Sequence, residues 1–145
     1  MPTHVTPSDV VNCFKVRKEV GEVTMILNNA GILSAVGRCW EVDLKHAKKV
    51  FEVNVFAHWY ILQEFLPQMI RRNKGHIIAT CSISGFLWCP EWATYASSKH
   101  AVKGYYDSLK EDLRRLKPVS DIKVSLVYPA LVATNLTSRF KLDAA

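Results

Sequence analysis

Val23-Thr24-Met25-Ile26-Leu27-Asn28-Asn29-Ala30-Gly31 is an apolar, partly β-branched run that ends in a polar turn containing glycine. This pattern predicts a short buried strand over 23–27 and a turn over 28–31. Two later runs, over 76–81 and 122–128, have the same apolar character and are followed by residues that favour turns. Continuous apolar runs of this length are typical of parallel strands that are covered on both faces.

Amphipathic stretches precede and separate the predicted strands. Ser8 to Val20 begins at a capping serine and is followed by Gly21. An apolar stripe predicts a second helix over about 43–72, and Pro90 suits the first position of a third helix that runs to about Lys117. Helices that alternate with strands lead to parallel pairing with right-handed crossovers. We therefore expect an open α/β sheet, in which ligands bind outside the carboxyl ends of the strands.

The composition is that of one ordinary folded domain, with 145 residues, of which 49% are apolar and 22% are charged. Basic clusters at 15–18, 71–74 and 114–117 contribute much of the formal net charge of +6. All three fall in the last turns of predicted helices, where cations complement the helix dipole. This placement accounts for the charge without a nucleic-acid partner.

Cysteine spacing argues against a metal site, and hydropathy argues against a secreted or membrane-spanning protein. Cys13, Cys39, Cys81 and Cys89 form no C-x-x-C pair, so we expect free, mostly buried thiols and no metal site. The N-terminus lacks a signal-peptide pattern, and no stretch reaches about 18 uninterrupted apolar residues. We expect no membrane span and, by default, a cytoplasmic location.

Tyr95 and Lys99 are four residues apart on the third predicted helix, so their side chains are neighbours at roughly 5–6 Å. At an effective dielectric near 20, an ammonium about 5 Å away stabilises a phenolate by about 3 kcal/mol, or on the order of two pKa units. Tyr95 is therefore a candidate acid or base near neutral pH. Tyr106 and Lys110 share the spacing, but they lie about 16 Å further along the helix. Only Tyr95 is placed to face the carboxyl edge of the sheet.

Three further polar features belong to the same edge. Ser82 follows the second strand and can donate to a developing oxyanion, with Ser84 as the competing choice. Asn29, with Ala30 and Gly31, allows a tight turn and close approach of the backbone. Asn54 lies in an apolar stripe, where an amide must be hydrogen-bonded. Either it holds a neighbouring helix or a backbone carbonyl, or it disturbs its helix locally and positions a water near the crevice.

These residues occur in one order along the chain: Asn28-Asn29-Ala30-Gly31, Asn54, Ser82, Tyr95-x-x-x-Lys99, and Pro129-Ala130-Leu131-Val132-Ala133-Thr134. Together they resemble the short-chain dehydrogenase/reductase family, whose Pro-Gly-x-Val-x-Thr segment lies beside the nicotinamide. The resemblance covers about 5–140. It implies an incomplete doubly wound, Rossmann-type parallel sheet with helices on both faces.

The resemblance also implies roles for individual residues. Tyr95 would exchange a proton with an alcohol or carbonyl oxygen while hydride passes to or from NAD or NADP, and Ser82 would steady that oxygen. Lys99 would lower the pKa of Tyr95 and bind the nicotinamide ribose, and Asn54 would hold a water that links Lys99 to solvent. The cofactor-binding residues would be Asn29, Ala30 and Gly31 on the adenosine side, Pro129, Val132 and Thr134 at the carboxamide, and Tyr95 and Lys99. No metal is implied.

Partner and substrate also follow from the resemblance. Family members commonly pair through the two long helices that here contain Asn54 and Tyr95, which implies a homodimer. The stretches at 19–23, 65–69 and 75–78 look like the retinol and 17-beta-hydroxysteroid dehydrogenase subgroup. That subgroup implies an apolar alcohol or ketone such as a retinoid or steroid, and it often resides on endoplasmic reticulum or lipid droplets.

The sequence departs from the family at the phosphate-binding turn, because its six glycines form no Gly-rich motif. The family pattern places two βα units, on the order of 60 residues, before Ser8. Residues 1–145 are therefore expected to be a single partial domain, the catalytic half without the N-terminal βαβ units. His4 stands near a usual Asp, and Ala130 replaces a usual Gly. Two hypotheses follow: a truncated oxidoreductase, inactive as this chain alone, or a non-catalytic remnant that acts as a binding or dimerisation module.

Overall fold

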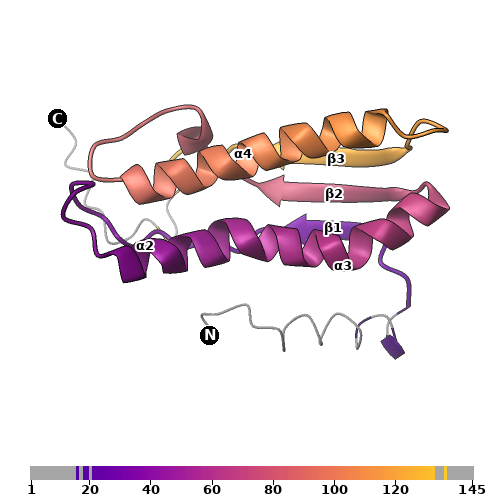
Figure 1. The fold of residues 1–145 in the computed structure, drawn as a ribbon, viewed down its shortest axis with the longest axis horizontal. Helices are drawn as coiled ribbons and strands as arrows, with labels where there is room; N and C mark the ends of the chain where they lie inside the picture. The colour runs from indigo at the N-terminus through magenta and orange to yellow at the C-terminus, as the bar shows by residue number, and fades with distance from the viewer. Residues whose placement is uncertain (1–15, 17, 20, 133–135, 137–145) are drawn as a thin grey trace.

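The computed structural model describes residues 16, 18, 19, 21–132 and 136. Strands and helices alternate along these residues as the sequence predicts (Figure 1). In chain order the elements are β1 (Met25–Asn28), α2 (Leu44–Phe51), the π-helix η1 (Glu52–Phe56), α3 (Ala57–Arg72), β2 (Gly75–Thr80), the 3-10 helix η2 (Ile83–Gly85), α4 (Ala93–Arg114) and β3 (Ile122–Val127).

The three strands form one sheet in the order β1-β2-β3, and both pairings are parallel. Ile78 of β2 lies opposite Leu27 of β1 and Ser125 of β3. Their carboxyl ends therefore meet at one edge of the sheet, here called the carboxyl edge; the opposite edge is the amino edge. The predicted α/β class and the parallel sheet are confirmed.

Helices α3 and α4 run side by side across one face of the sheet (Figure 1). On the covered face, Ile77 and Ala79 are fully buried, and the core continues through Leu62, Phe65 and Val102. Side chains of the next residues along a strand point to the other face, so Met25 and Leu27 of β1 stay 58% and 62% exposed. The helix predicted over 8–20 lies outside the described residues, apart from helical backbone at 16, 18 and 19.

The long helix predicted over 43–72 is observed as the continuous succession α2, η1 and α3. Asp43 caps it, because its carboxylate accepts from the backbone N–H of Lys45 at 2.8 Å. The helix ends at Asn73, whose φ of 49° is left-handed. A Cβ at Gly75 would lie 2.8 Å from the sulfur of Met69, so glycine lets β2 begin directly beneath the end of the helix.

The third helix begins later than its proline predicts. Pro90 is followed by Glu91 with a φ of 67°, and the Trp92 N–H bonds the Cys89 carbonyl at 3.2 Å, so a turn occupies this segment. Helix α4 starts at Ala93 and ends at Arg114, not Lys117. The prediction of a helix start at Pro90 is wrong, because a left-handed residue cannot continue a right-handed helix.

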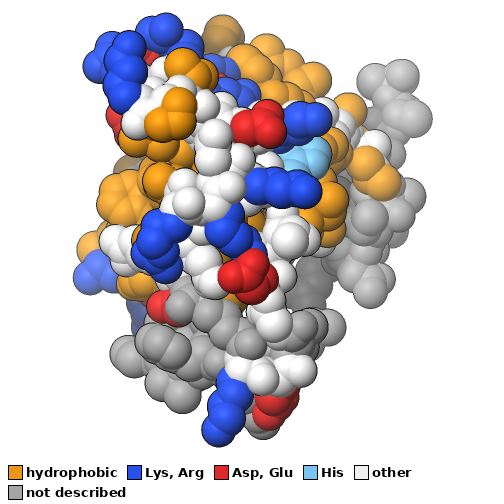
Figure 2. Space-filling view, turned by 90° about the vertical axis from the view of Figure 1, so that its right-hand side faces the viewer, with side chains coloured by type: hydrophobic (Ala, Val, Ile, Leu, Met, Phe, Trp, Pro, Cys, Tyr) orange, Lys and Arg blue, Asp and Glu red, His pale blue; other side chains and the backbone are white. Residues whose placement is uncertain are grey.

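Basic side chains gather at the amino edge, where α3 and α4 end (Figure 2). Arg71 and Arg72 lie in the last turn of α3, and Arg114 lies in the last turn of α4. Glu111 accepts from Arg114 and Arg115 at 2.7 and 2.8 Å. Within the described residues, the predicted basic last turns are confirmed for the second and third clusters.

The described cysteines are free, but they are not mostly buried as predicted. Cys81 is buried at the end of β2, whereas Cys39 and Cys89 are exposed because they lie in loops rather than in the core. The described part of the chain has no group of His, Cys, Asp or Glu that could hold a metal ion. None of its helices is both long and apolar enough to cross a membrane.

Candidate active site

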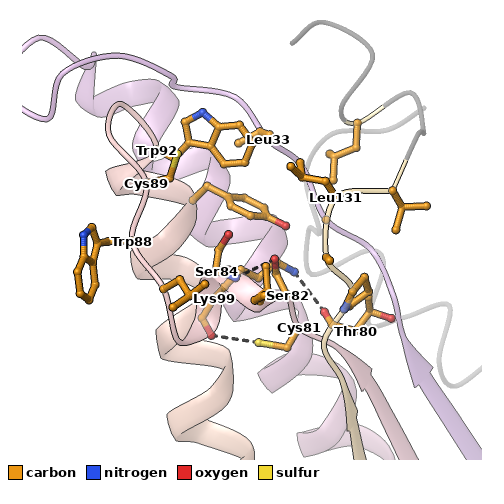
Figure 3. Close-up of a pocket in the computed structure, with 18 of the residues that line it drawn as sticks. Leu33, Thr80, Cys81, Ser82, Ser84, Trp88, Cys89, Trp92, Lys99 and Leu131 are labelled. Atoms are coloured by element: carbon orange, nitrogen blue, oxygen red, sulfur yellow. Dashed lines mark hydrogen bonds between the residues drawn. The ribbon is translucent and has the colours of Figure 1, made fainter. Parts of the chain in front are cut away.

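One cavity of about 530 Å³ opens at the carboxyl edge, between the turns that follow the strands and the first turns of α4. Figure 3 shows Trp92 and Leu33 on one side of it, Leu131 across from them, and Ser82 and Lys99 beneath. Its polar floor and apolar walls make it a cavity for a largely apolar molecule that carries one polar group.

Ser82 is held at the end of β2 by the short helix that follows it. Its hydroxyl accepts from the backbone N–H of Ser84 at 3.1 Å, and its side chain lies beside the Tyr95 phenol, whose pKa it lowers. Gly85 lets this helix touch α4, since a Cβ there would lie 3.0 Å from the Cys81 sulfur and 3.2 Å from the Lys99 carbonyl oxygen. Ser84 also lines the cavity, but Ser82 is the serine that contacts Tyr95.

Tyr95 and Lys99 lie on the same face of α4 and both are buried, at 7% and 3% exposure. The Lys99 Nζ is 5.6 Å from the centre of the Tyr95 ring and donates to the Thr80 carbonyl at 3.2 Å (Figure 3). Tyr106 points into the core and is fully buried. The prediction that Tyr95, and not Tyr106, faces the carboxyl edge is confirmed.

The pKa of Tyr95 is raised, not lowered as the sequence predicts. Burial raises it, and the hydrogen bond with Ser82 only partly offsets that effect. Burial also lowers the pKa of Lys99. The expected depression fails because the phenolate would lose its hydration and because the ammonium is directed at the Thr80 carbonyl rather than at the Tyr95 hydroxyl.

Asn54 lies in the π-helix η1 and is fully buried. Its Oδ1 accepts from the Ile32 N–H at 2.8 Å, and its Nδ2 donates to the Ile32 carbonyl at 3.0 Å and to the Ser98 hydroxyl at 3.1 Å. It therefore holds a backbone carbonyl and a neighbouring helix, and the helix is also disturbed at this residue. A π-turn inside a long helix is frequent at functional sites.

Gly31 lies against both Asn54 and Lys99. A Cβ built on Gly31 would be 3.6 Å from the Asn54 Oδ1 and 3.6 Å from the Lys99 Nζ. The turn after β1, the π-helix and α4 thus meet at one point behind Tyr95. The structure brings together all four predicted catalytic residues, which are Asn54, Ser82, Tyr95 and Lys99.

The residues predicted to bind the cofactor are distributed around the same cavity. Asn29 accepts from the Thr80 hydroxyl at 2.9 Å and lines the cavity together with Gly31, Pro129 and Val132. Ala30, between Asn29 and Gly31, is not among the lining residues. Thr134 and His4 lie outside the described residues. Ala130, in place of the usual glycine, also lines the cavity.

Sequence reasoning missed the apolar wall and one hydrogen-bond partner of Asn54. The wall comes mainly from loops, and its residues include Leu33, Leu87, Trp88, Cys89, Trp92 and Leu131. The Trp92 ring stands edge-on to Tyr95, with centroids 6.2 Å apart. Ser98 links Asn54 to α4. The apolar run at 86–89, directly after the Ser82 turn, is the sequence signal that indicates such a wall.

The structure is thus an α/β domain with a parallel sheet, and a Ser, Tyr and Lys cluster lies at the edge where ligands of such sheets bind. Residues 6–145 match the model of the family described as short chain dehydrogenase. The chain therefore belongs to the short-chain dehydrogenase family.

Individual relatives agree with this assignment. The chain is 37% identical over 128 residues to 17-beta-hydroxysteroid dehydrogenase 13 of Rattus norvegicus, covering 85% of this chain and 40% of the relative. It is 38% identical over 118 residues to 1-deoxy-11-beta-hydroxypentalenate dehydrogenase of Streptomyces exfoliatus, covering 80% and 42%. The chain thus spans about 40% of the length of these curated relatives. The expected likeness to the hydroxysteroid dehydrogenase subgroup is confirmed.

A solved structure shows the same arrangement of elements. A short chain dehydrogenase/reductase from Burkholderia phymatum, in complex with NAD, superposes with a TM-score of 0.81 at 32% identity. The match covers 89% of this chain and 45% of that structure. The fold is therefore that of a Rossmann-type dehydrogenase domain, present in part.

Proposed function

We propose that this chain is the catalytic half of an NAD(P)-dependent oxidoreductase that interconverts an alcohol and a ketone or aldehyde. The observation that carries this proposal is the buried contact of Ser82 with Tyr95 at the floor of an apolar cavity, with Lys99 beneath the ring. A carbonyl oxygen placed there would meet two hydroxyl donors. Membership of the family supports the same reaction class.

Tyr95 is the proton donor of the proposed reduction. Its raised pKa keeps the phenol protonated at neutral pH, which is the state that can donate to a carbonyl oxygen as hydride reaches the carbonyl carbon. Ser82 donates a second hydrogen bond to that oxygen. Lys99 and Asn54 lie behind Tyr95, where they can return a proton to it through a water held by Asn54. In alcohol oxidation the same residues act in reverse.

The described residues suit the nicotinamide end of the cofactor. Lys99 lines the cavity and would bind a ribose hydroxyl, and Pro129 and Val132 form the adjoining wall. We assign Asn29, Ala30 and Gly31 to the adenosine side and Thr134 to the carboxamide. NAD or NADP, when bound, supplies or accepts the hydride. The sequence has no Gly-rich turn for the pyrophosphate, so we expect this chain alone to hold the cofactor weakly.

The proposed substrate is an apolar alcohol or ketone of steroid or retinoid size. The walls of the cavity are aliphatic and aromatic, and its polar groups lie together on the floor. A flat apolar molecule with one terminal oxygen matches this distribution, because the oxygen can reach Ser82 and Tyr95 while the rest stays against Trp92 and Leu131.

We also propose a homodimer through the helices that contain Asn54 and Tyr95. Small exposed residues, Ser97, Gly104 and Ser108, lie along one side of α4 and would let a second helix approach closely. Trp59 stacks on Tyr105 next to this side, with centroids 5.0 Å apart. Sedimentation equilibrium of the chain and of Gly104→Arg tests this interface. A monomer in both cases would contradict it.

A second candidate function is a non-catalytic binding or dimerisation module built on a partial domain. Two observations favour it: the sequence has no Gly-rich turn, and Met25 and Leu27 are exposed on the sheet. Calorimetric titration with NADH and NADPH tests the module, because a non-catalytic module has no need to bind either cofactor tightly. Micromolar binding by the 145-residue chain would exclude the module.

The oxidoreductase itself is tested by turnover of a chimera. The chain is joined to the N-terminal region of 17-beta-hydroxysteroid dehydrogenase 13 of Rattus norvegicus, and steroid ketone reduction is followed by loss of NADH or NADPH absorbance. We expect Tyr95→Phe to lower kcat by about a thousandfold, since it removes the acid, while cofactor affinity stays nearly unchanged. Tyr105→Phe, the loss of one hydroxyl outside the cavity, is the matched control and should keep full activity. Retained activity in Tyr95→Phe would rule out Tyr95 as the acid.

A further inference from the structure

A second buried polar cluster lies in the core beneath the candidate active site. The Asn28 Nδ2 donates to the Tyr106 hydroxyl at 2.7 Å, and the His58 Nδ1 is 2.9 Å from the same hydroxyl. Asn28, His58 and Tyr106 are all buried, at 4%, 2% and 0% exposure, respectively. Their surroundings are otherwise apolar core, which includes Leu62 and Val102. Polar groups in such a place cost free energy unless they are hydrogen-bonded. The three side chains must therefore keep the relative positions in which they bond each other.

The hydrogen-bond pattern lets Tyr106 join both partners. Its oxygen accepts from Asn28, so its own hydrogen is free to be donated to His58 Nδ1 in the tautomer that accepts there. Within the described part of the chain, the His58 Nε2 and the Asn28 Oδ1 have no hydrogen-bond partner. His58 is neutral at pH 7, because burial and the nearby Lys99 lower its pKa to about 4. A neutral imidazole that accepts at Nδ1 carries its hydrogen on Nε2.

The cluster repeats, deeper in the core, the contacts that hold Asn54. The upper set joins Ile32, Asn54 and Ser98; the lower set joins Asn28, His58 and Tyr106. His58 lies one helical turn after Asn54, and Tyr106 lies about two turns after Ser98. The same three segments therefore meet twice: β1 with the turn that follows it, the η1–α3 helix, and α4. Neither set can move far without straining the other.

We infer that His58, Tyr106 and Asn28 are positioning residues that fix the register of α3 against α4 and β1 and thereby hold Asn54 on Ile32. Apolar side chains between helices tolerate small sliding, whereas a three-way hydrogen bond is satisfied in one register only. The π-turn at Asn54 adds one residue to the helix, and without a fixed register that extra residue could shift to a neighbouring turn. A fixed register therefore keeps the π-turn at Asn54. The inference rests on the proposed function only where it treats Asn54 as part of an active site.

The Ile32 amide is a direct probe of the upper set, since its N–H donates to the Asn54 Oδ1. Hydrogen exchange of this amide, followed by NMR in the ligand-free chain, is compared with that of Ile77 in the central strand. We expect Tyr106→Phe to speed exchange at Ile32 about tenfold more than at Ile77, because two buried groups lose their partner and α3 shifts locally. Tyr105→Phe is the matched control and should change neither rate.

Variants at His58 separate a positioning role from mere loss of stability. His58→Asn keeps an acceptor near the Nδ1 position and should preserve Ile32 protection, whereas His58→Leu should lose it as Tyr106→Phe does. In the unaltered chain, the ¹⁵N shifts of His58 should report hydrogen on Nε2. The inference is overturned if Ile32 and Ile77 accelerate by the same factor, if Tyr105→Phe matches Tyr106→Phe, or if Nδ1 carries the hydrogen. None of these measurements needs cofactor or substrate, so they stand apart from the turnover test of the oxidoreductase.

Discussion

The carboxyl edge and the amino edge of the sheet hold their charged groups in opposite ways. At the amino edge, Arg114 and Arg115 have side chains that are 69% and 72% exposed, and both bond Glu111 in the solvent. At the carboxyl edge, Lys99 is 3% exposed and donates to the Thr80 carbonyl. The exposed arginines form ion pairs away from the cavity, whereas the buried Lys99 lines it and could take part in a reaction there.

The two edges should also differ in how much free energy of unfolding a single substitution costs. Water screens an exposed ion pair and can replace either partner, so its loss is small. A buried polar group has no such replacement, and leaving its partner unpaired costs free energy. The two edges therefore differ in sensitivity to mutation and in the pH at which they respond.

The largest difference is expected between Asn54→Leu and Glu111→Gln. Leucine has a similar volume but leaves the Ile32 N–H and carbonyl without their partner, which should lower the free energy of unfolding by about 3 kcal/mol. Glu111→Gln at the amino edge should lower the unfolding free energy at pH 7 only slightly, because water screens this exposed ion pair. Urea unfolding of both variants measures the contrast, and equal losses would break the distinction between the edges.

A smaller difference is expected in acid. Because the pKa of His58 is lowered from 6.5 to about 4, the unfolded chain binds a proton in this window that the folded chain does not. Stability should therefore fall as pH drops from about 6.5 to about 4, by about 3 kcal/mol for this group. His58→Asn should lack that part of the decline. Parallel pH curves for the two proteins, from urea titrations at each pH, would contradict the assignment.

The amino edge responds at lower pH. Hydrogen bonds from Arg114 and Arg115 hold the pKa of Glu111 at about 2. Its contribution is therefore present at pH values above its usual pKa and is lost only as pH falls towards 2. The two windows are separate enough for one pH series to report both on His58, in the core beneath the carboxyl edge, and on Glu111 at the amino edge.

Much of the site could be predicted from the sequence, because its signals are local. Ser82 follows an apolar strand, and the spacing of Tyr95 and Lys99 puts them on one helical face. Asn54 interrupts an apolar stripe, and the structure has a π-turn there. These features need only neighbouring residues along the chain, so strand ends and helical periodicity suffice to find them.

The rest depends on contacts between distant segments. Lys99 bonds the Thr80 carbonyl, and burial raises the pKa of Tyr95, neither of which follows from the spacing of the pair. The sequence predicts too early a start for α4, because nothing in it marks the left-handed backbone of Glu91. His58 and Tyr106 occupy core positions of ordinary helical stripes, so only the folded arrangement shows that they bond each other.

An NMR titration of the ¹⁵N-labelled chain with nicotinamide mononucleotide tests whether the carboxyl edge is the nicotinamide site. We expect binding in the millimolar range, with shifts at the amides of Lys99 and Val132. The amides of Arg114 and Arg115 should stay unchanged when inorganic phosphate at equal concentration serves as the reference. Shifts confined to the amino edge, or no shifts at either edge, would contradict the claim that the carboxyl edge is the nicotinamide site.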